Sequence, residues 1–180
     1  MRKSDTILSV QKKLEQKVIH RIENHLRDAW FKSIPSRVAF VTIKQKETLE
    51  IWGELNSNWV FIKNYPFTAC SGQLRPKVKE GVKQIPEGIY EIEHLNLYSL
   101  FYLSLKISYP NEFDKPIVEK QGRSNLGGDI FIRGKNKTVG CIPIGDDEIE
   151  EVFYLASKIL SGRIPVYNCP KDFRKSAVVG

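Results

Sequence analysis

A cysteine that follows a glycine is the feature of this sequence best suited to covalent chemistry. Residues 127–144 begin with Gly127 and Gly128, continue through a short apolar run, and then form a polar loop that ends at Gly140 and Cys141. Because glycine has no Cβ atom, a substrate carbonyl can approach the backbone beside the thiol closely. The amides of Gly140 and Cys141 are therefore candidate donors to the oxyanion of a tetrahedral intermediate.

Basic side chains in the same segment favour the ionised form of this thiol. Arg133, Lys135 and Lys137 precede Cys141, and nearby positive charge lowers the pKa of a cysteine, which makes it a better nucleophile. A single cysteine after a glycine is also often a small buried residue. The residues alone therefore leave two interpretations open, a nucleophile and a packing residue.

The other two cysteines are weaker candidates for chemistry. We expect Cys70 to be buried and inert, and Cys169, beside Pro170, to be structural or exposed. The three cysteines have no histidine at a spacing that would build a zinc site. No metal or cofactor is predicted from these positions.

One long amphipathic helix is predicted near the start of the chain, over residues 6–30. Apolar residues recur there at every fourth position, which places them on one helical face, and Asp5 or Ser4 is the expected N-cap. The helix is expected to end by 33–35, and His20 and His25 are expected on its surface. The repeating apolar residues are Val10, Leu14, Val18, Ile22, Leu26 and Trp30.

The remainder of the sequence alternates apolar and polar residues with the period of two that is typical of strands. A second helix is expected over 147–160, where Asp147 and Glu150 have the spacing of a capping box. Residues 72–88 are predicted to form a loop. The predicted strands are 38–43, 49–52, 59–62, 67–70, 89–92, 103–107, 130–132 and 164–167. These elements predict a mainly β (α+β) fold.

The segment Thr138-Val139-Gly140-Cys141 resembles the active-site signature of the L,D-transpeptidase catalytic domain, in the short-loop branch of the murein transpeptidases. The resemblance extends over about residues 38–168 and includes several motifs in the same order. These further motifs lie at 69–72, 76–77, 80–81, 85–90, 103–105, 109–111, 127–132 and 142–146.

This resemblance implies a β-sandwich fold, with one helix after the cysteine, that acts on peptidoglycan or muropeptides. In the family, the cysteine attacks the carbonyl of the third stem-peptide residue and expels the terminal D-residue. The acyl group then passes to an amine or to water, without a metal or organic cofactor. It further implies a bacterial protein of cell-wall biogenesis and cell shape. The site residues expected from it are Cys141, Arg133 and Gly140 for catalysis, and Gly134, Thr138, Tyr102, Tyr109, Arg75 and Lys77 for substrate binding.

The sequence departs from this family at the general base. Arg133 stands where the family has the histidine paired to the thiol, and Tyr102 aligns with a second family histidine. Arginine cannot accept a proton at ordinary pH, although its charge can stabilise a thiolate. Asp129 is expected about 13 Å from position 133 along one strand face, and His94 on a different turn. Two interpretations therefore remain open. The chain is either an active enzyme, in which Tyr102 or a group of the substrate replaces the base, or a catalytically degenerate module that binds the wall or has a regulatory role.

The chain's 28 basic and 21 acidic residues give a net charge of +7 at pH 7, which suits an anionic partner. No basic stripe interleaved with aromatic residues indicates nucleic-acid binding, and no stretch is apolar enough to span a membrane. The expected organisation is a helix over 1–35, a catalytic domain over 36–170 and a tail over 171–180. The resemblance indicates the cell envelope or periplasm. The lack of a signal peptide in this sequence keeps a cytoplasmic location open, and the oligomeric state is not predicted.

Overall fold

The computed structural model describes residues 5–70, 77, 84–119, 126–136, 140–159 and 162–176. Its first element, the helix α1, spans Ile7–Asp28, close to the predicted 6–30. Thr6 is the N-cap, in place of the expected Asp5 or Ser4, and its side chain accepts a hydrogen bond from the amide of Ser9. The predicted apolar face is confirmed, because the buried residues of α1 include Val10, Leu14, Val18, Ile22 and Leu26.

Eight strands form one sheet in the order β3-β2-β1-β8-β4-β5-β6-β7. Two neighbouring pairs, β1 with β8 and β6 with β7, are parallel, and the others are antiparallel. The strands are β1 (Val38–Ile43), β2 (Thr48–Leu55), β3 (Asn58–Pro66), β4 (Gly88–Ser99), β5 (Tyr102–Ile107), β6 (Phe131–Arg133), β7 (Ile142–Pro143) and β8 (Pro165–Cys169).

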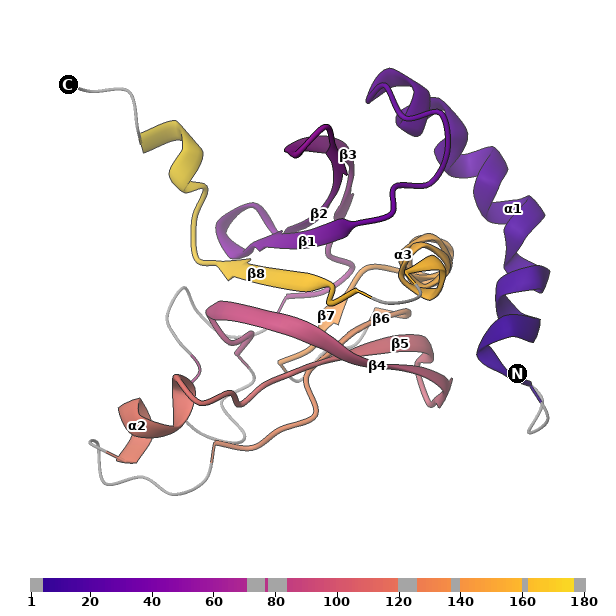
Figure 1. Cartoon of the computed structure of the whole chain (residues 1–180). Coiled ribbons are helices and arrows are strands. Elements are labelled where there is room, and N and C mark those ends of the chain that lie inside the picture. The colour runs from indigo at the N-terminus through magenta and orange to yellow at the C-terminus, as the bar shows by residue number, and fades with distance from the viewer. Residues whose placement is uncertain are drawn as a thin grey trace.

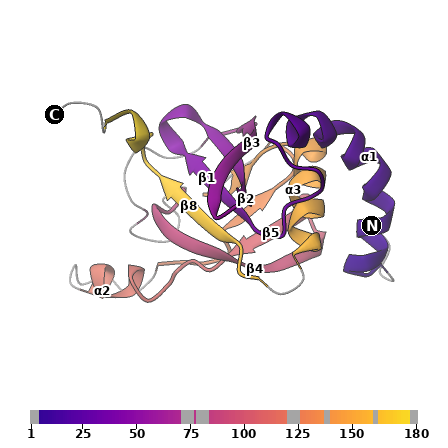
Figure 2. The same ribbon diagram turned by 45° about the horizontal axis from the view of Figure 1, so that its top comes forward.

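The sheet bends so that β1, β2, β3 and β8 lie above β4, β5, β6 and β7 in the view of Figure 1. Alternate side chains of both halves, such as Phe40 in β1 and Leu105 in β5, are fully buried in one core. The helix α3 (Asp146–Lys158) packs between this core and α1 (Figure 2). The predicted α+β fold with one helix after the cysteine is therefore confirmed.

Short elements complete the chain, and some local predictions were wrong. The helix α2 (Asp114–Glu119) and the 3-10 helices η1 (Lys44–Lys46) and η2 (Phe173–Ser176) were not predicted. Residues 67–70 are not a strand. Trp30 does not share the buried face of α1, because the chain turns at this residue with a φ of 64° and leaves its side chain 82% exposed. No described helix is long and apolar enough to cross a membrane.

Ion pairs hold α1 against α3. Glu150 of α3 is 5% exposed and pairs with Lys17 and Arg21 of α1 at 2.7 and 2.6 Å. Its other oxygen accepts a hydrogen bond from the Tyr102 hydroxyl at 2.8 Å. This role replaces the predicted capping box, because the N-cap of α3 is Gly145 and no side chain caps the helix. Burial alone would raise the pKa of Glu150, but these hydrogen bonds outweigh burial and lower it.

Replacement of Glu150 tests this clamp. We expect Glu150→Gln to lower the free energy of unfolding by about 1–3 kcal/mol at pH 7, because charged hydrogen bonds are lost from a buried position. Because the folded pKa of Glu150 lies below the ordinary value of 4.5, its contribution is complete above that pH and disappears as the pH falls through the folded pKa. Urea unfolding at several pH values measures both effects.

The matched control is Glu23→Gln, an exposed position on α1. Equal stability of Glu150→Gln and Glu23→Gln at pH 7 would show that the clamp contributes nothing.

Candidate active site

Cys141 lies immediately before β7, where the chain comes alongside β6. Ile142 of β7 is paired in parallel register with Ile132 of β6, and both side chains are fully buried. Since side chains alternate along a strand, Cys141 faces the opposite side of the sheet from this core. Its side chain is half-buried, and its thiol donates a hydrogen bond to the Asp129 carbonyl at 3.8 Å. The sulfur is thus held at the edge of the core without being sealed inside it.

Gly140 fixes the backbone that precedes this thiol. Its φ is +94°, a left-handed conformation that favours glycine. A Cβ atom placed there would lie 3.0 Å from the backbone oxygen of Gln84, a residue that is only 3% exposed. The close approach of these two backbone segments therefore requires glycine at position 140.

A second tight approach anchors the loop that follows β6. A Cβ atom on Gly134 would clash with the carboxylate of Asp146 and would lie 3.0 Å from the backbone oxygen of Phe101. Asp146 accepts a hydrogen bond from the Lys135 amide at 2.8 Å. The Thr68 hydroxyl donates to the Lys135 carbonyl at 2.6 Å, and the amide of Thr68 donates to Pro143. The first turn of α3 and residue 68 thus tie this loop to the strand that follows the cysteine.

Arg133 is a buried cation, 2% exposed, at the end of β6. Its guanidinium lies 3.6 Å from the centre of the Phe101 ring, and Nη1 donates to the Gly134 carbonyl at 3.2 Å. In the described part of the chain it forms no ion pair with a carboxylate, and its Nε has no hydrogen-bond acceptor. The hydroxyl of Ser104, its partner in register on β5, is also buried without a hydrogen bond.

Charged side chains gather around Lys106 of β5, and Lys106 and Glu93 were missed by the sequence analysis. Lys106 lies 3.2 Å from the carboxylate of Glu93 and 3.4 Å from that of Asp129, whose backbone carbonyl accepts the hydrogen bond of the Cys141 thiol. The hydrogen bond to Glu93, and more weakly the one to Asp129, raises the pKa of Lys106 against the effect of its partial burial. The alternation of apolar and polar residues over 103–107 could have predicted the position of Lys106, because it places this side chain on the face of the sheet opposite the core.

The positions of Asp129 and His94 differ from those expected. Asp129 has a φ of 54° and precedes β6, so it does not lie along a strand face with position 133. His94 lies within β4, not on a turn, and is paired in register with Lys106. Its ring centre lies 6.5 Å from that of Phe131, on the β6 strand. A histidine therefore stands two strands away from β6, on the same side of the sheet as Lys106.

Four of the six predicted substrate-binding residues, Tyr102, Tyr109, Gly134 and Lys77, lie in the described part of the chain. The Tyr102 hydroxyl donates a hydrogen bond to Glu150. Burial of this hydroxyl, and to a lesser degree its interaction with the Glu150 carboxylate, raises the pKa of Tyr102 well above the usual value. Tyr109 is buried, donates to the Leu126 carbonyl at 3.2 Å, and has the Lys77 ammonium 6.0 Å from its ring centre. Thr138 and Arg75 lie outside the described residues.

The other two cysteines differ in their exposure to solvent. Cys70 is exposed, so the expectation that it is buried was wrong, and Cys169 is half-buried in β8. Among the described residues, no three His, Cys, Asp or Glu side chains lie close enough together to hold a metal ion.

Comparison with known proteins finds a homologue of this chain. No protein-family model matches it. It is homologous to YafK of Escherichia coli (strain K12), whose name assigns it provisionally to the L,D-transpeptidases. The two sequences are 25% identical over 127 residues, which cover 69% of this chain and 49% of YafK.

Two solved structures share the fold. The helical cell shape determining protein Pgp2 from Campylobacter jejuni has a TM-score of 0.58 and 21% identity, over 83% of this chain and 55% of Pgp2. Bd1075 from Bdellovibrio bacteriovorus has a TM-score of 0.50 and 21% identity, over 73% of this chain and 46% of Bd1075. The chain thus spans about half the length of YafK, Pgp2 and Bd1075. Its fold is of the L,D-transpeptidase type, which confirms that part of the sequence prediction.

Substitution of Gly140 tests the backbone constraint beside the thiol. We expect Gly140→Ala to lower the free energy of unfolding by about 1–3 kcal/mol, because a Cβ atom is forced against the Gln84 backbone at a left-handed φ. It should also change the rate at which iodoacetamide alkylates Cys141, since the residue before the thiol must move. Chemical unfolding and peptide mass spectrometry measure the two effects.

Gly128→Ala is the matched control, because a Cβ atom at Gly128 meets nothing within 4 Å. If Gly140→Ala is as stable as Gly128→Ala and its thiol reacts at the same rate, the close approach does not position Cys141.

Proposed function

We propose that this chain is a cysteine-dependent acyl transferase domain that acts on peptidoglycan stem peptides in the cell envelope, as an L,D-transpeptidase or, with water as the acceptor, an L,D-carboxypeptidase. The observation that carries the proposal is the half-buried Cys141 thiol, held after a left-handed glycine at the edge of the core. Homology to YafK and the shared fold support the substrate class.

In the proposed reaction, the Cys141 thiolate attacks the carbonyl carbon of the third stem-peptide residue. The amides of Gly140 and Cys141 donate hydrogen bonds to the oxyanion. The bond to the nitrogen of the terminal D-residue then breaks, that nitrogen takes up a proton, and a thioester remains on the sulfur. An acceptor amine or water attacks the thioester carbonyl, loses a proton, and releases the thiol.

Arg133 and Lys106 have different roles in this proposal. The buried guanidinium of Arg133 favours negative charge on the same face of the β6–β7 pair, because it has no carboxylate partner among the described residues. Its described contacts are with the Phe101 ring and the Gly134 carbonyl. Lys106 is already paired with Glu93 and Asp129, so it holds these two carboxylates in place and adds no net positive charge. Neither group removes the thiol proton, which must pass to solvent or to the substrate.

The placement of Arg133 also supports a second candidate function, a wall-binding module without turnover. General acid–base catalysis contributes about 10²- to 10⁴-fold to such reactions, and arginine cannot supply it. A protein that kept the fold but lost the base would bind muropeptides without cleaving them. The two candidates differ in one measurable quantity, the rate at which the stem peptide is cleaved.

The decisive experiment incubates the purified protein with tetrapeptide muropeptides and follows the products by chromatography and mass spectrometry. We expect slow cleavage by the wild type and none by Cys141→Ala. Arg133→His should raise the rate by about 10²-fold, because it supplies a group that can accept and return a proton. Arg133→Lys keeps the charge without a base of suitable pKa and should show no gain.

Each other outcome has a defined meaning. Binding of muropeptides without cleavage by the wild type would establish the wall-binding module. Fast cleavage by the wild type with no gain in Arg133→His would show that position 133 does not limit the reaction. Cleavage that survives Cys141→Ala would overturn the proposed nucleophile. Thermal unfolding of each variant shows that a lost rate is not a lost fold.

A further inference from the structure

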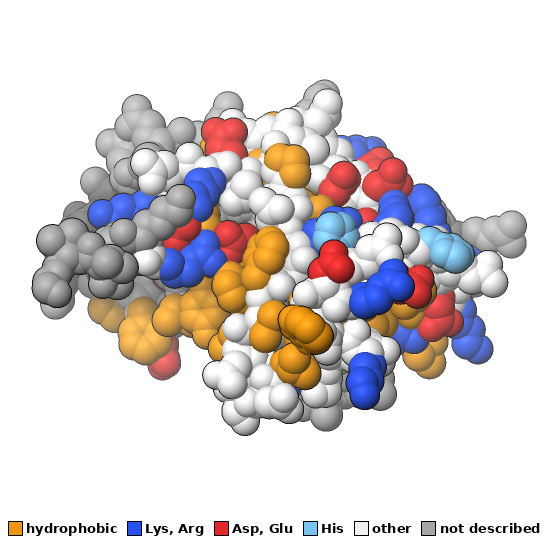
Figure 3. All heavy atoms as spheres, turned by 90° about the horizontal axis from the view of Figure 1, so that it is seen from above, with side chains coloured by type: hydrophobic (Ala, Val, Ile, Leu, Met, Phe, Trp, Pro, Cys, Tyr) orange, Lys and Arg blue, Asp and Glu red, His pale blue; other side chains and the backbone are white. Residues whose placement is uncertain are grey.

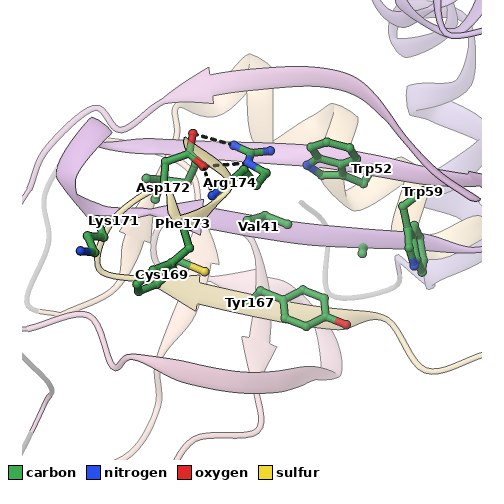
Figure 4. A pocket seen from close by; sticks show the side chains of 11 residues that line it. Val41, Trp52, Trp59, Tyr167, Cys169, Lys171, Asp172, Phe173 and Arg174 are labelled. Atoms are coloured by element: carbon green, nitrogen blue, oxygen red, sulfur yellow. Dashed lines mark hydrogen bonds and ion pairs between the residues drawn. The ribbon is translucent and has the colours of Figure 1, made fainter. Parts of the chain in front are cut away.

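A pocket of about 280 Å³ lies on the outer face of the β1–β2–β8 region, away from Cys141 in the order of the sheet. Aromatic side chains dominate its walls, and residues around η2 close one end (Figure 4). Its lining residues are Ala39, Val41, Ile43, Trp52, Trp59, Tyr167, Cys169, Lys171, Asp172, Phe173 and Arg174.

Strand alternation explains why this face is apolar. Ala39, Val41 and Ile43 are the alternate residues of β1 that point away from the core, and they form the floor of the pocket. Trp52 and Tyr167 stand on the strands either side of β1, as Figure 4 shows. Exposed apolar side chains also gather on the side of the molecule seen in Figure 3, between groups of basic and acidic ones. Ala39 and Ile43 are only 3% and 1% exposed, so Val41 is the accessible part of the floor. A concave, largely apolar surface of this kind is typical of a binding site.

A network of ion pairs holds the wall near η2 in place. The guanidinium of Arg174 makes two hydrogen bonds of 2.9 Å to Glu50 of β2 and one of 2.8 Å to Asp172. It also lies 5.3 Å from the Trp52 ring centre, and Lys46 pairs with Asp172 at 2.6 Å. These bonds lower the pKa of Asp172 well below its usual range. The pocket wall is therefore preorganised, and its two carboxylates are already neutralised by Arg174 and Lys46.

One cation at the pocket is left without a carboxylate. The ammonium of Lys171 lies 5.5 Å from the ring centre of Phe173. The carboxylates of Asp172 and Glu50 are paired with Lys46 and Arg174. Within the residues that the structure describes, Lys171 forms no ion pair, so it is a positive charge at the rim that can complement an anion.

We propose that this pocket binds a small apolar anion, a medium-chain acyl carboxylate, with the chain over Val41 and the carboxylate at Lys171. The volume of about 280 Å³ lies near the lower end of the range for small-molecule sites, which suits a short ligand such as an alkyl chain. A saccharide fits less well, because the floor of Ala39, Val41 and Ile43 offers no hydrogen bonds to replace those its hydroxyls make with water. The site is independent of the reaction proposed for Cys141.

Tryptophan fluorescence provides a direct binding test, because two of the three tryptophans, Trp52 and Trp59, line the pocket. The third tryptophan, Trp30, does not line the pocket, so all titrations use the Trp30→Phe variant of the protein. The ligands are decanoate, decanol and decyltrimethylammonium, with chitotetraose as the saccharide. We expect saturable binding of decanoate, at least fivefold tighter than that of decanol, and weaker binding still of the cation.

Two variants separate the charge from the cavity. Lys171→Gln should remove the preference for decanoate over decanol, whereas Lys115→Gln, an exposed lysine in α2, should keep it. Val41→Phe should fill the floor and weaken decanoate binding at least tenfold, with circular dichroism as the check on folding. Equal binding by Val41→Phe, no charge preference in the wild type, or tighter binding of chitotetraose than of decanoate would overturn the proposal.

Cys169 provides a second measurement on the unmodified protein. Its thiol lies in the pocket, and burial raises its pKa, so it should react slowly with N-ethylmaleimide. We expect decanoate to slow the alkylation of Cys169 further and to leave the exposed Cys70 unaffected, as peptide mass spectrometry would show. Equal protection of both cysteines, or of neither, would contradict a ligand in this pocket.

Discussion

The contact between the backbones of Gly140 and Gln84 is the constraint on which the proposed site depends. Residue 140 has a left-handed conformation that glycine alone adopts easily, and a side chain there would press against the Gln84 backbone just before the chain enters β7. Because β7 then pairs in parallel with β6, the Cys141 thiol is placed outside the core and against the Asp129 carbonyl. The chemistry proposed for this sulfur follows from backbone packing more than from any side chain that touches it.

The charges near the thiol differ from a conventional thiol–imidazole pair. Arg133 is buried against Phe101, and Lys106 is shared between Glu93 and Asp129. Arginine cannot carry a proton from one step of a reaction to the next, and the raised pKa of Lys106 keeps its ammonium protonated. Neither side chain therefore supplies the general base that acyl transfer needs. The supply of this base distinguishes the two proposed functions, acyl transfer and wall binding.

Long periodic elements were predictable from the sequence, and short or tertiary features were not. The repeat from Val10 to Leu26 identified α1, and the alternation of 38–43 matched β1 without error. The strand β7 has only two residues, too few for a periodic signal, and α2 has six. His94 was misplaced because β4 continues to Ser99 beyond its alternating start. The contact of Arg133 with Phe101 joins residues from separate strands and turns, so no local pattern encodes it.

The most direct test of the central claim is intact-protein mass spectrometry after incubation with a carbapenem, whose strained lactam carbonyl acylates nucleophilic thiols. An accessible, activated Cys141 predicts one adduct with the full mass of the ring-opened drug, located at Cys141 by peptide mapping. The adduct should be lost in Cys141→Ala and kept in Cys70→Ala. An unmodified wild-type protein, or an adduct on Cys70 in place of Cys141, would contradict the account.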